Sequence, residues 1–194
     1  MTAITGQNNA EVRVAITGNV YVAPVGTAGP TDIATALNAS FLNLGFLDAS
    51  GVVFSKSDSF DPIGAWQSTS PLRYVPKDRT VTAKFVLQQL NSVSLPLWGN
   101  GGAVAVGSPT SEYKYTISDQ LTPNPMAYVF DGIDSVNNYT YRFYFSNAMV
   151  TATTDLTLSR STNMQVGLTV TALTPVDGTS NLVQVFSTDP NLTI

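Results

Sequence analysis

The sequence contains no cysteine and no histidine. Without cysteine it can form no disulfide, no thiolate nucleophile and no zinc–thiolate cluster. Without histidine it cannot build a Ser-His-Asp triad, and it lacks the side chain that most often transfers protons near neutral pH. Most hydrolase and transferase designs are thereby excluded, while a pair of carboxylates or an oxygen-ligand metal site stays open.

Charge and long apolar runs are also scarce. Charged residues make up 11% of the chain, against about 25% in an average soluble protein. The net charge is −4 and the nine Lys and Arg residues are scattered, so there is no basic footprint for nucleic acid or for anionic membranes. No window approaches the roughly 18 apolar residues of a membrane-spanning helix, and the N-terminus lacks a signal-peptide pattern. We therefore expect no membrane partner and no tight binding of DNA.

Hydroxylated and β-branched residues are abundant instead. The chain of 194 residues contains 24 Thr and 18 Ser, and Val, Ile and Thr together make 52 residues. This composition favours strands over helices, and the length favours one domain. We expect a mobile N-terminal arm over residues 1–18, followed by a single all-β domain, a sandwich or barrel-like fold, over residues 19–194.

Several segments alternate between apolar and polar residues with the period of a strand. In residues 79–87, for example, Val81, Ala83, Phe85 and Leu87 fall on one face, opposite the polar residues. Strands are predicted at 20–25, 41–47, 52–59, 79–87, 113–117, 126–130, 139–146, 156–158, 163–172 and 182–186. One short flanking helix is predicted at about residues 91–98, with Asn91 as its N-cap, and Thr31 could cap a single helical turn through Leu37.

Residues 60–77 form a long hairpin or loop that is unsuited to the centre of a sheet. Pro62, Gly64, Pro71 and Pro76 interrupt it, and proline cannot donate a hydrogen bond to a ladder. Trp66 lies in this polar context, where full exposure would forgo about 1.5–3 kcal/mol of burial. Compact domains seldom carry loops of this length without a function. Trp66 therefore either anchors a protein interface or packs locally over the base of the hairpin.

Some polar clusters could carry chemistry, and each has a simpler structural explanation. Asp58 and Asp61 could be the carboxylate pair of a glycosidase, although solvated loop acids are favoured. Oxygen ligands for calcium are offered by Asp131, Asp134, Asn137 and Asn138. Their spacing does not match a calcium-binding loop of 12 residues, so a turn between strands is favoured.

Two further patterns have the same ambiguity. The glycine-rich run at 99–102 follows the predicted helix instead of opening one, so it is a poor phosphate cradle. A stacking platform for bases or sugars could be formed by Tyr139, Tyr141, Phe143 and Phe145. Packing within or between sheets explains such alternation more simply. We expect no catalytic residue, no metal ligand and no cofactor.

A series of short motifs occurs in order between residues 18 and 100. It starts with GNVYVAPVGTA at 18–28 and PTD at 30–32, and continues with ALNASF at 36–41, LGFL at 44–47 and GV at 51–52. AWQ at 65–67, LR at 72–73, FVL at 85–87 and LWG at 97–99 follow. The order resembles the major tail proteins, or tail tube proteins, of long non-contractile-tailed bacteriophages, especially those of actinobacteria. Beyond Gly101 the resemblance rests on the strand pattern alone.

The resemblance implies a structural virion protein that is not an enzyme. Its fold would be a β-sandwich with a flanking helix, and six subunits would form a ring that stacks into a tube for genome passage. The implied partners are further copies of the chain, the tape measure, tail terminator and baseplate or tip proteins, and transiently the genomic DNA. The implied location is the phage tail, after assembly in the host cytoplasm. A ring of six chains at −4 each would carry about −24, which repels DNA phosphates from a lumen.

The resemblance also places a ring-contacting hairpin at residues 60–77. The residues expected to make this assembly contact are Phe60, Asp61, Ile63, Trp66, Gln67, Leu72, Arg73 and Tyr74. Two other functions stay open. One is a phage fibre or carbohydrate-binding β-sandwich that uses the aromatic residues, and the other, less favoured, is a glycosidase that uses Asp58 and Asp61.

Overall fold

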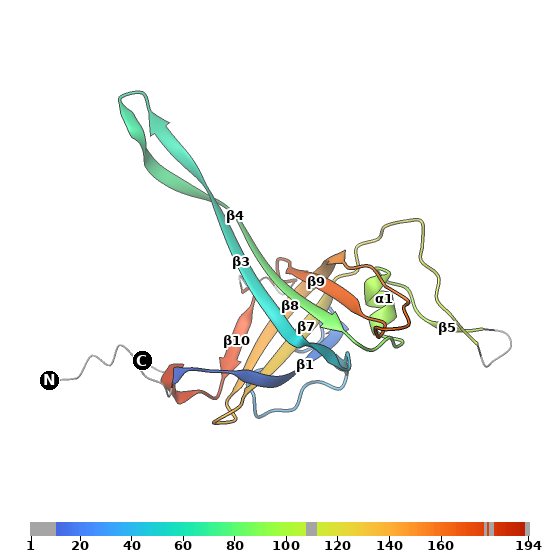
Figure 1. Ribbon diagram of the computed structural model, residues 1–194. Coiled ribbons are helices and arrows are strands. Elements are labelled where there is room, and N and C mark those ends of the chain that lie inside the picture. The colour runs from blue at the N-terminus through green and yellow to red at the C-terminus, as the bar shows by residue number, and fades with distance from the viewer. Residues whose placement is uncertain (1–10, 108–111, 177, 179–180, 193–194) are drawn as a thin grey trace.

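The computed structural model describes residues 11–107, 112–176, 178 and 181–192 (Figure 1). The predicted all-β class with one short helix is confirmed. The elements are β1 (Ala15–Pro24), β2 (Leu42–Asn43), β3 (Leu47–Ala65), β4 (Ser68–Leu87), α1 (Ser94–Trp98), β5 (Ala105–Val106), β6 (Tyr113–Lys114), β7 (Met126–Asp134), β8 (Thr140–Thr153), β9 (Val166–Ala172), β10 (Gln184–Ser187) and a 3₁₀ turn at Pro190–Leu192. The division into an arm at 1–18 and a domain at 19–194 stays a prediction, since residues 1–10 lie outside the described part.

One antiparallel sheet contains all the long strands. Its strand order is β2-β1-β7-β8-β9-β4-β3, and β10 pairs with β8 beside β9. β8 can hold both neighbours because β10 pairs with Tyr141–Tyr144 and β9 pairs with Ala148–Thr153. Among the described residues β3 pairs only with β4, so the sheet is not a closed barrel.

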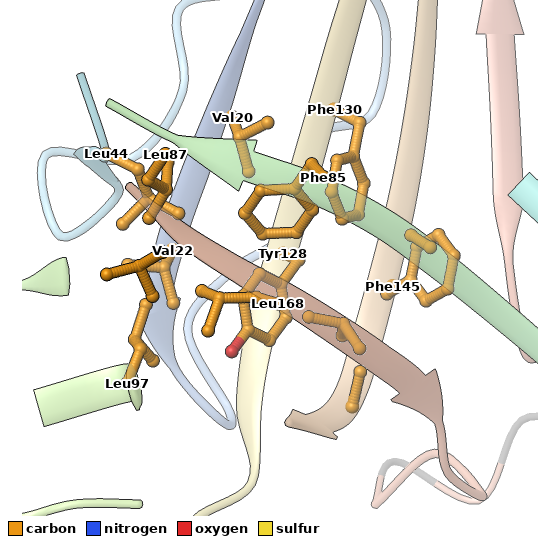
Figure 2. Close-up of a cluster of buried hydrophobic side chains, with 14 residues drawn as sticks. Val20, Val22, Leu44, Phe85, Leu87, Leu97, Tyr128, Phe130, Phe145 and Leu168 are labelled. Atoms are coloured by element: carbon orange, nitrogen blue, oxygen red, sulfur yellow. The ribbon is translucent and has the colours of Figure 1, made fainter. Parts of the chain in front are cut away.

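The sheet rolls over so that its two halves face each other across the core (Figure 2). Val20, Tyr128 and Phe145 come from the half made of β1, β7 and β8, and Phe85 and Leu168 come from β4 and β9. In the same core Phe54 of β3 stacks on Phe143 of β8, with ring centroids 4.3 Å apart. The architecture is therefore sandwich-like in its packing although it is built from a single sheet.

The alternation in the sequence correctly predicted which faces of β4 and β9 are buried. Val81, Ala83, Phe85 and Leu87 all point into the core or its margin. In β9 the core residues are Val166, Leu168, Val170 and Ala172. Since successive side chains of a strand point to opposite faces, the polar residues between them are directed outward.

β8 departs from simple alternation at a bulge. Tyr128 pairs with Phe145 and Met126 pairs with Ala148, so Ser146 and Asn147 of β8 stand opposite Ala127 alone. The extra residue shifts the phase by one. Phe145 and Ala148, three positions apart, thereby both face the core.

The outer face of β1, β7 and β8 is covered by the segment 25–41. Phe41 packs there against Tyr144, Ala127 and Val129. The segment is irregular, so the helical turn predicted through Leu37 is wrong. Asp32 accepts a hydrogen bond from Thr35 N at 2.5 Å, and this local side-chain bond competes with helix formation.

The helix is shorter than predicted, and three predicted strands are absent or reduced. Asn91 Oδ1 accepts hydrogen bonds from Val93 N and Ser94 N, both at 2.8 Å, so the capping bond forms ahead of a helix that begins at Ser94. The strand predicted at 41–47 is limited to β2 and to Leu47 at the start of β3. The strand predicted at 113–117 is limited to β6. The strand predicted at 156–158 is wrong, because Leu156 reaches the core from an irregular segment.

Candidate functional site

The longest feature outside the core is the hairpin made by β3 and β4. Its ladder runs from the pair Leu47–Leu87 to the pair Ala65–Ser68, and the turn contains only Trp66 and Gln67. The strands leave the core beyond Phe54 and extend far from the rest of the molecule (Figure 1). We call residues 55–80 the projecting hairpin. The predicted segment 60–77 is its distal part, and it forms a paired hairpin whose ladder shifts register at Lys77 and again between the pairs Ile63–Arg73 and Ala65–Ser68.

Prolines fit this hairpin because it has only two strands. Pro62 pairs with Tyr74 and Pro76 pairs with Phe60, two positions apart on the same ladder. In a two-stranded ribbon half of the backbone N–H groups point away from the partner strand, and a proline at such a position loses no ladder bond. A bulge at Lys77, between the pairs Ser59–Asp78 and Phe60–Pro76, adds further irregularity.

A charged cluster separates the distal part from the core. Asp58 Oδ1 accepts a hydrogen bond from Arg79 Nε at 2.7 Å, and Oδ2 accepts one from Arg79 Nη2 at 3.2 Å. Lys56 Nζ lies 2.7 Å from the same Oδ2. Hydrogen bonding to Arg79, followed by Lys56, lowers the pKa of Asp58 to about 2. Asp58 is therefore an ionised partner of two bases near neutral pH, because its pKa lies far below that pH.

The pair of Asp58 and Asp61 does not have the geometry of a glycosidase site. The two residues are three positions apart on a strand, so their side chains leave opposite faces. Asp61 Oδ1 instead lies 3.8 Å from Lys77 Nζ across the hairpin. A glycosidase acid needs a raised pKa, whereas the pKa of Asp58 is lowered.

The distal part carries large apolar side chains that contact no core. Trp66 is 100% exposed at the turn, and Leu72 and Tyr74 are each more than 60% exposed. Phe60 and Ile63 are about half exposed. The structure therefore contradicts local packing of Trp66 over the base of the hairpin, which the sequence left open. Asp61, Gln67 and Arg73 lie on the same distal part and are also exposed.

A cavity of about 750 Å³ lies where the two ends of the rolled sheet approach each other. One wall is β3 and the turn before it, and the other is the first half of β1. We call this cavity the seam. Its apolar lining includes Ile16, Phe46, Val52, Phe54 and Phe143. Ile16 and Phe46 are 66% and 73% exposed, so the seam presents apolar surface to solvent.

The backbone along both walls of the seam has free hydrogen-bonding edges. β3 ends the strand order, so its outer edge has no partner strand in the described part of the chain. β2 pairs with β1 only at Tyr21 and Val22, which leaves the outer edge of Ala15–Asn19 without a neighbouring strand there. Such edges are ready templates for another extended segment.

The outward face of β3, β4, β8 and β9 is lined with hydroxyl groups. Thr82 pairs with Ser55 on one side and Thr171 on the other, and Thr171 Oγ1 lies 2.7 Å from Thr151 Oγ1. Thr80 and Thr169 extend the same face. These side chains are half-buried or exposed, and we call this surface the hydroxyl face.

The carboxylates considered for calcium are used by the fold. Asp131 binds Arg142 through two hydrogen bonds of 2.8 Å. Asp134 is buried and accepts hydrogen bonds from Val14 N, Val136 N and Asn137 N. The first of these, with burial opposing it, lowers the pKa of Asp134. The group closes the turn between β7 and β8, as the simpler explanation predicted. Asn138 has a positive φ of 56° in this turn, a conformation that asparagine tolerates.

The remaining sequence candidates also have structural roles. Phe143 and Phe145 belong to the core, so the four aromatic residues form no exposed stacking platform. Tyr139 and Tyr141 contact Arg13, whose guanidinium carbon lies 5.1 Å from the Tyr139 ring centroid. The glycine run ends the helix, with positive φ at Gly101 and Gly102.

Two features have no clear signal in the sequence. Arg13 binds Asp189 through hydrogen bonds of 2.6 and 2.9 Å, which ties the two ends of the described chain together. This contact lowers the pKa of the buried Asp189 carboxyl. The other feature is the excursion between α1 and β7, which carries β5 and β6 away from the sheet (Figure 1). Both depend on residues distant in the sequence or on irregular backbone.

Over the described ranges, no cluster of three or more Asp or Glu residues is arranged to hold a metal ion. Nor does that part of the chain contain a helix with the length and apolarity needed to cross a membrane.

A family model matches nearly the whole sequence. It is described as "Phage tail tube protein" and matches residues 5–193. No curated protein matches the chain.

Two solved structures are similar over most of their length, but only loosely. The first, from "Virion of native gene transfer agent (GTA) particle", has a TM-score of 0.42 and 11% identity, covering 94% of this chain and 99% of that one. The second, from "Cryo-EM Structure of an Extracellular Contractile Injection System, PVC sheath-tube complex in extended state", has a TM-score of 0.41 and 10% identity, covering 96% and 98%. Family membership rests on the family model, not on these likenesses.

Proposed function

We propose, since the chain belongs to the phage tail tube protein family, that its copies join through the projecting hairpin into stacked rings. Membership makes it a structural protein of the phage tail and therefore of the virion. The details proposed here are rings of six subunits in a long non-contractile tail. Further proposed partners are the tape measure, the tail terminator and the baseplate or tip proteins.

The observation that carries the role of the hairpin is its exposed apolar end. Trp66, Leu72 and Tyr74 are all largely exposed, while β3 and β4 pair in this part of the hairpin only with each other. Monomeric proteins rarely expose a group of large apolar residues without an interaction partner. An isolated two-stranded hairpin is also only marginally stable in water, so contacts with a neighbouring copy would fix its position.

The hydroxyl face supports a role as the lining of the channel. Ser55, Thr82 and Thr171 form a continuous row across three strands, and hydroxyl groups interact with water without attracting phosphates as Lys and Arg do. Lys84, which pairs with Thr169, lies on the same face as a base beside this row. A ring of six subunits would carry a net charge of about −24, which adds a weak repulsion of DNA. We expect the assembled channel to let DNA pass without holding it.

Electron microscopy of the purified full chain tests the proposed assembly. Tubes of constant diameter, built from stacked rings with no added ligand, are the expected result. The matched preparation is the Arg142→Ala variant, in which loss of the Asp131 contact disturbs the fold and should reduce assembly. A wild-type protein that stays monomeric at all concentrations would overturn the proposal. So would discrete small oligomers that bind glycans, since they indicate a fibre or carbohydrate-binding module.

A further inference from the structure

We propose that the seam is the receptor for the distal hairpin of a second copy of the chain, whose apolar end enters between β1 and β3. This inference rests on the proposed function and adds the position at which the hairpin binds. It commits to one occupant, the residues 60–77 of a neighbouring subunit, and to one site on the receiving subunit.

The seam offers backbone groups as well as apolar surface. The outer edges of β3 and of Ala15–Asn19 have no partner strand among the described residues. The distal hairpin also has two free outer edges, because β3 and β4 pair there only with each other. An extended segment that binds a sheet edge gains main-chain hydrogen bonds, while pockets receive alternate side chains.

A hairpin cannot fill the seam of its own subunit. β3 forms one wall of the seam at Val52 and Phe54, and the same strand then continues away from it into the projecting hairpin (Figure 1). Every residue of β3 from Ser55 to Ile63 has a partner on β4, so the hairpin has no unpaired stretch near its base at which to fold back. Residues 69–72, which have no partner in the ladder, lie near its tip. The occupant must therefore come from another copy. A contact between two different surfaces repeats from subunit to subunit and builds rings or stacks.

Charge also favours a contact between the distal hairpin of one copy and the seam of another. The residues that line the seam include Asp48 and Asp131 but no lysine or arginine. Asp48 accepts hydrogen bonds from Ser50 N and Gln88 Nε2, the first of which chiefly lowers its pKa. Residues 60–77 carry Asp61, Arg73 and Lys77, a net charge of +1. Asp131 is already paired with Arg142, so a positive hairpin end would meet the negative charge of Asp48 in a cavity whose lining residues include no base.

The apolar area on the hairpin is sufficient for a specific contact. Phe60, Trp66 and Tyr74 are exposed on it. Aromatic side chains bury about 150–250 Å² each. Trp66 is fully exposed, Phe60 51% and Tyr74 61%, so the three could contribute roughly 320–530 Å². A standard interface buries about 800 Å² on each partner. Main-chain pairing and the smaller side chains would supply the remaining area.

Cysteine cross-linking tests the proposal in a chain that has no native cysteine. One preparation carries Gln67→Cys beside Trp66 at the exposed turn. A second carries Ala49→Cys at the exposed rim of the seam. A third, the matched control, carries Val185→Cys on the exposed strand β10. The first is mixed in equal amounts with the second or the third, assembled, treated with a short bismaleimide, and analysed by mass spectrometry.

We expect most of the Gln67→Cys chains to be linked to Ala49→Cys chains, and background linkage to Val185→Cys chains. Normal tubes with only background linkage at position 49 would overturn the seam as receptor while leaving assembly intact. Linkage predominantly to position 185 would place the hairpin on β10 and would also overturn it. Absence of tubes from the wild type and from every variant, with no linkage at position 49, would overturn both proposals.

A charge exchange provides an independent readout. Arg73→Glu and Asp48→Lys should each reduce the amount of sedimentable tube, because each brings like charges together in the contact. The double variant should recover a large part of the loss. Circular dichroism melting identifies any variant whose fold is damaged. Equal losses in folded single variants without recovery in a folded double variant would contradict a contact between these residues.

Discussion

The two halves of the hairpin made by β3 and β4 differ sharply in the burial of their side chains. At the base, Phe54, Ala83 and Phe85 pack in the core. Beyond Lys56 and Asp58, the same two strands in the same ladder project into solvent and carry Phe60, Trp66 and Tyr74 there. Hydrogen-bond pairing is therefore common to both halves, and burial of side chains is not.

This difference divides the apolar residues of one continuous element into a buried group and an exposed group. At the base they stabilise the subunit, since burial of each large side chain contributes about 1.5–3 kcal/mol. In the distal part they contribute nothing comparable to the isolated subunit, because they are exposed. Their burial is available to an interface instead. Substitutions in the two halves should therefore affect different properties, folding in one and assembly in the other.

The largest expected effect on folding follows from Phe85→Ala. Phe85 is 3% exposed and its ring centroid lies 5.7 Å from that of Phe130. Removing a buried phenylalanine costs about 3–5 kcal/mol, which lowers the melting temperature of a domain of this size by roughly 6–20 °C. The matched control is Phe60→Ala in the distal part, expected to change stability by less than about 0.5 kcal/mol. If Phe85→Ala and Phe60→Ala lowered the melting temperature equally, the distinction between the two halves of the hairpin would be contradicted.

The next effect concerns assembly and is expected for Trp66→Ala. If Trp66 is buried in a subunit contact, its loss removes about 1.5–3 kcal/mol from that contact. The concentration needed for assembly should rise about 10- to 100-fold, and the melting temperature of the unassembled subunit should stay the same. Val136→Ala, at an exposed apolar residue in the turn after β7, is the control. Light scattering across a dilution series measures the concentration at which each variant assembles. Equal values for Trp66→Ala and Val136→Ala would contradict a role of Trp66 in the subunit contact.

Two glycines, one near the base and one in the distal part, allow the same comparison with a smaller expected effect on stability. Gly45, near the base, has a φ of 94°, and a Cβ there would collide with the Gln89 side chain. The same Gln89 Oε1 accepts a hydrogen bond of 2.7 Å from Phe46 N. Gly45→Ala should therefore cost at least about 1–2 kcal/mol in urea unfolding. Gly64, in the distal part, has open space around it, so Gly64→Ala should leave stability and the urea midpoint unchanged.

The smallest effect concerns the charged cluster between the halves. The pKa of Asp58 is lowered from 3.8 to about 2, chiefly by Arg79. Its stabilising contribution is thus present above the ordinary pKa and is lost as pH falls through about 2. Arg79→Gln should raise the pKa of Asp58 toward its ordinary value, while Lys84→Gln should not. NMR titration of the carboxyl carbon measures this, and an unchanged pKa in Arg79→Gln would contradict the contact.

The sequence predicted those parts of the fold that depend on local pattern. The alternation of Val81, Ala83, Phe85 and Leu87 predicted the buried face of β4, and the prolines predicted that residues 60–77 lie outside the core. The bulge at Ser146 and Asn147 was not predictable, since two strands must be aligned before an extra residue can be recognised. The strand expected near Leu156 was wrong because apolar spacing does not specify backbone pairing.

The candidate site was predictable in part. Trp66 in a polar segment indicated an interface residue, and the structure leaves it exposed. Its assignment to assembly stays a proposal. The seam could not be predicted, because its walls come from residues 15–19 and 45–54 and meet only when the sheet rolls. The ion pair of Arg13 and Asp189 likewise joins residues 176 positions apart.

Replacing residues 62–75 by a two-residue Gly-Ser turn tests most directly whether the distal hairpin serves assembly and not folding. The shortened loop itself changes closure entropy by only about 0.6 kcal/mol per halving of its length. Circular dichroism should show unchanged β content and melting of the subunit, and sedimentation velocity should show no tubes. Tubes like those of the wild type, or an unfolded subunit, would contradict the account.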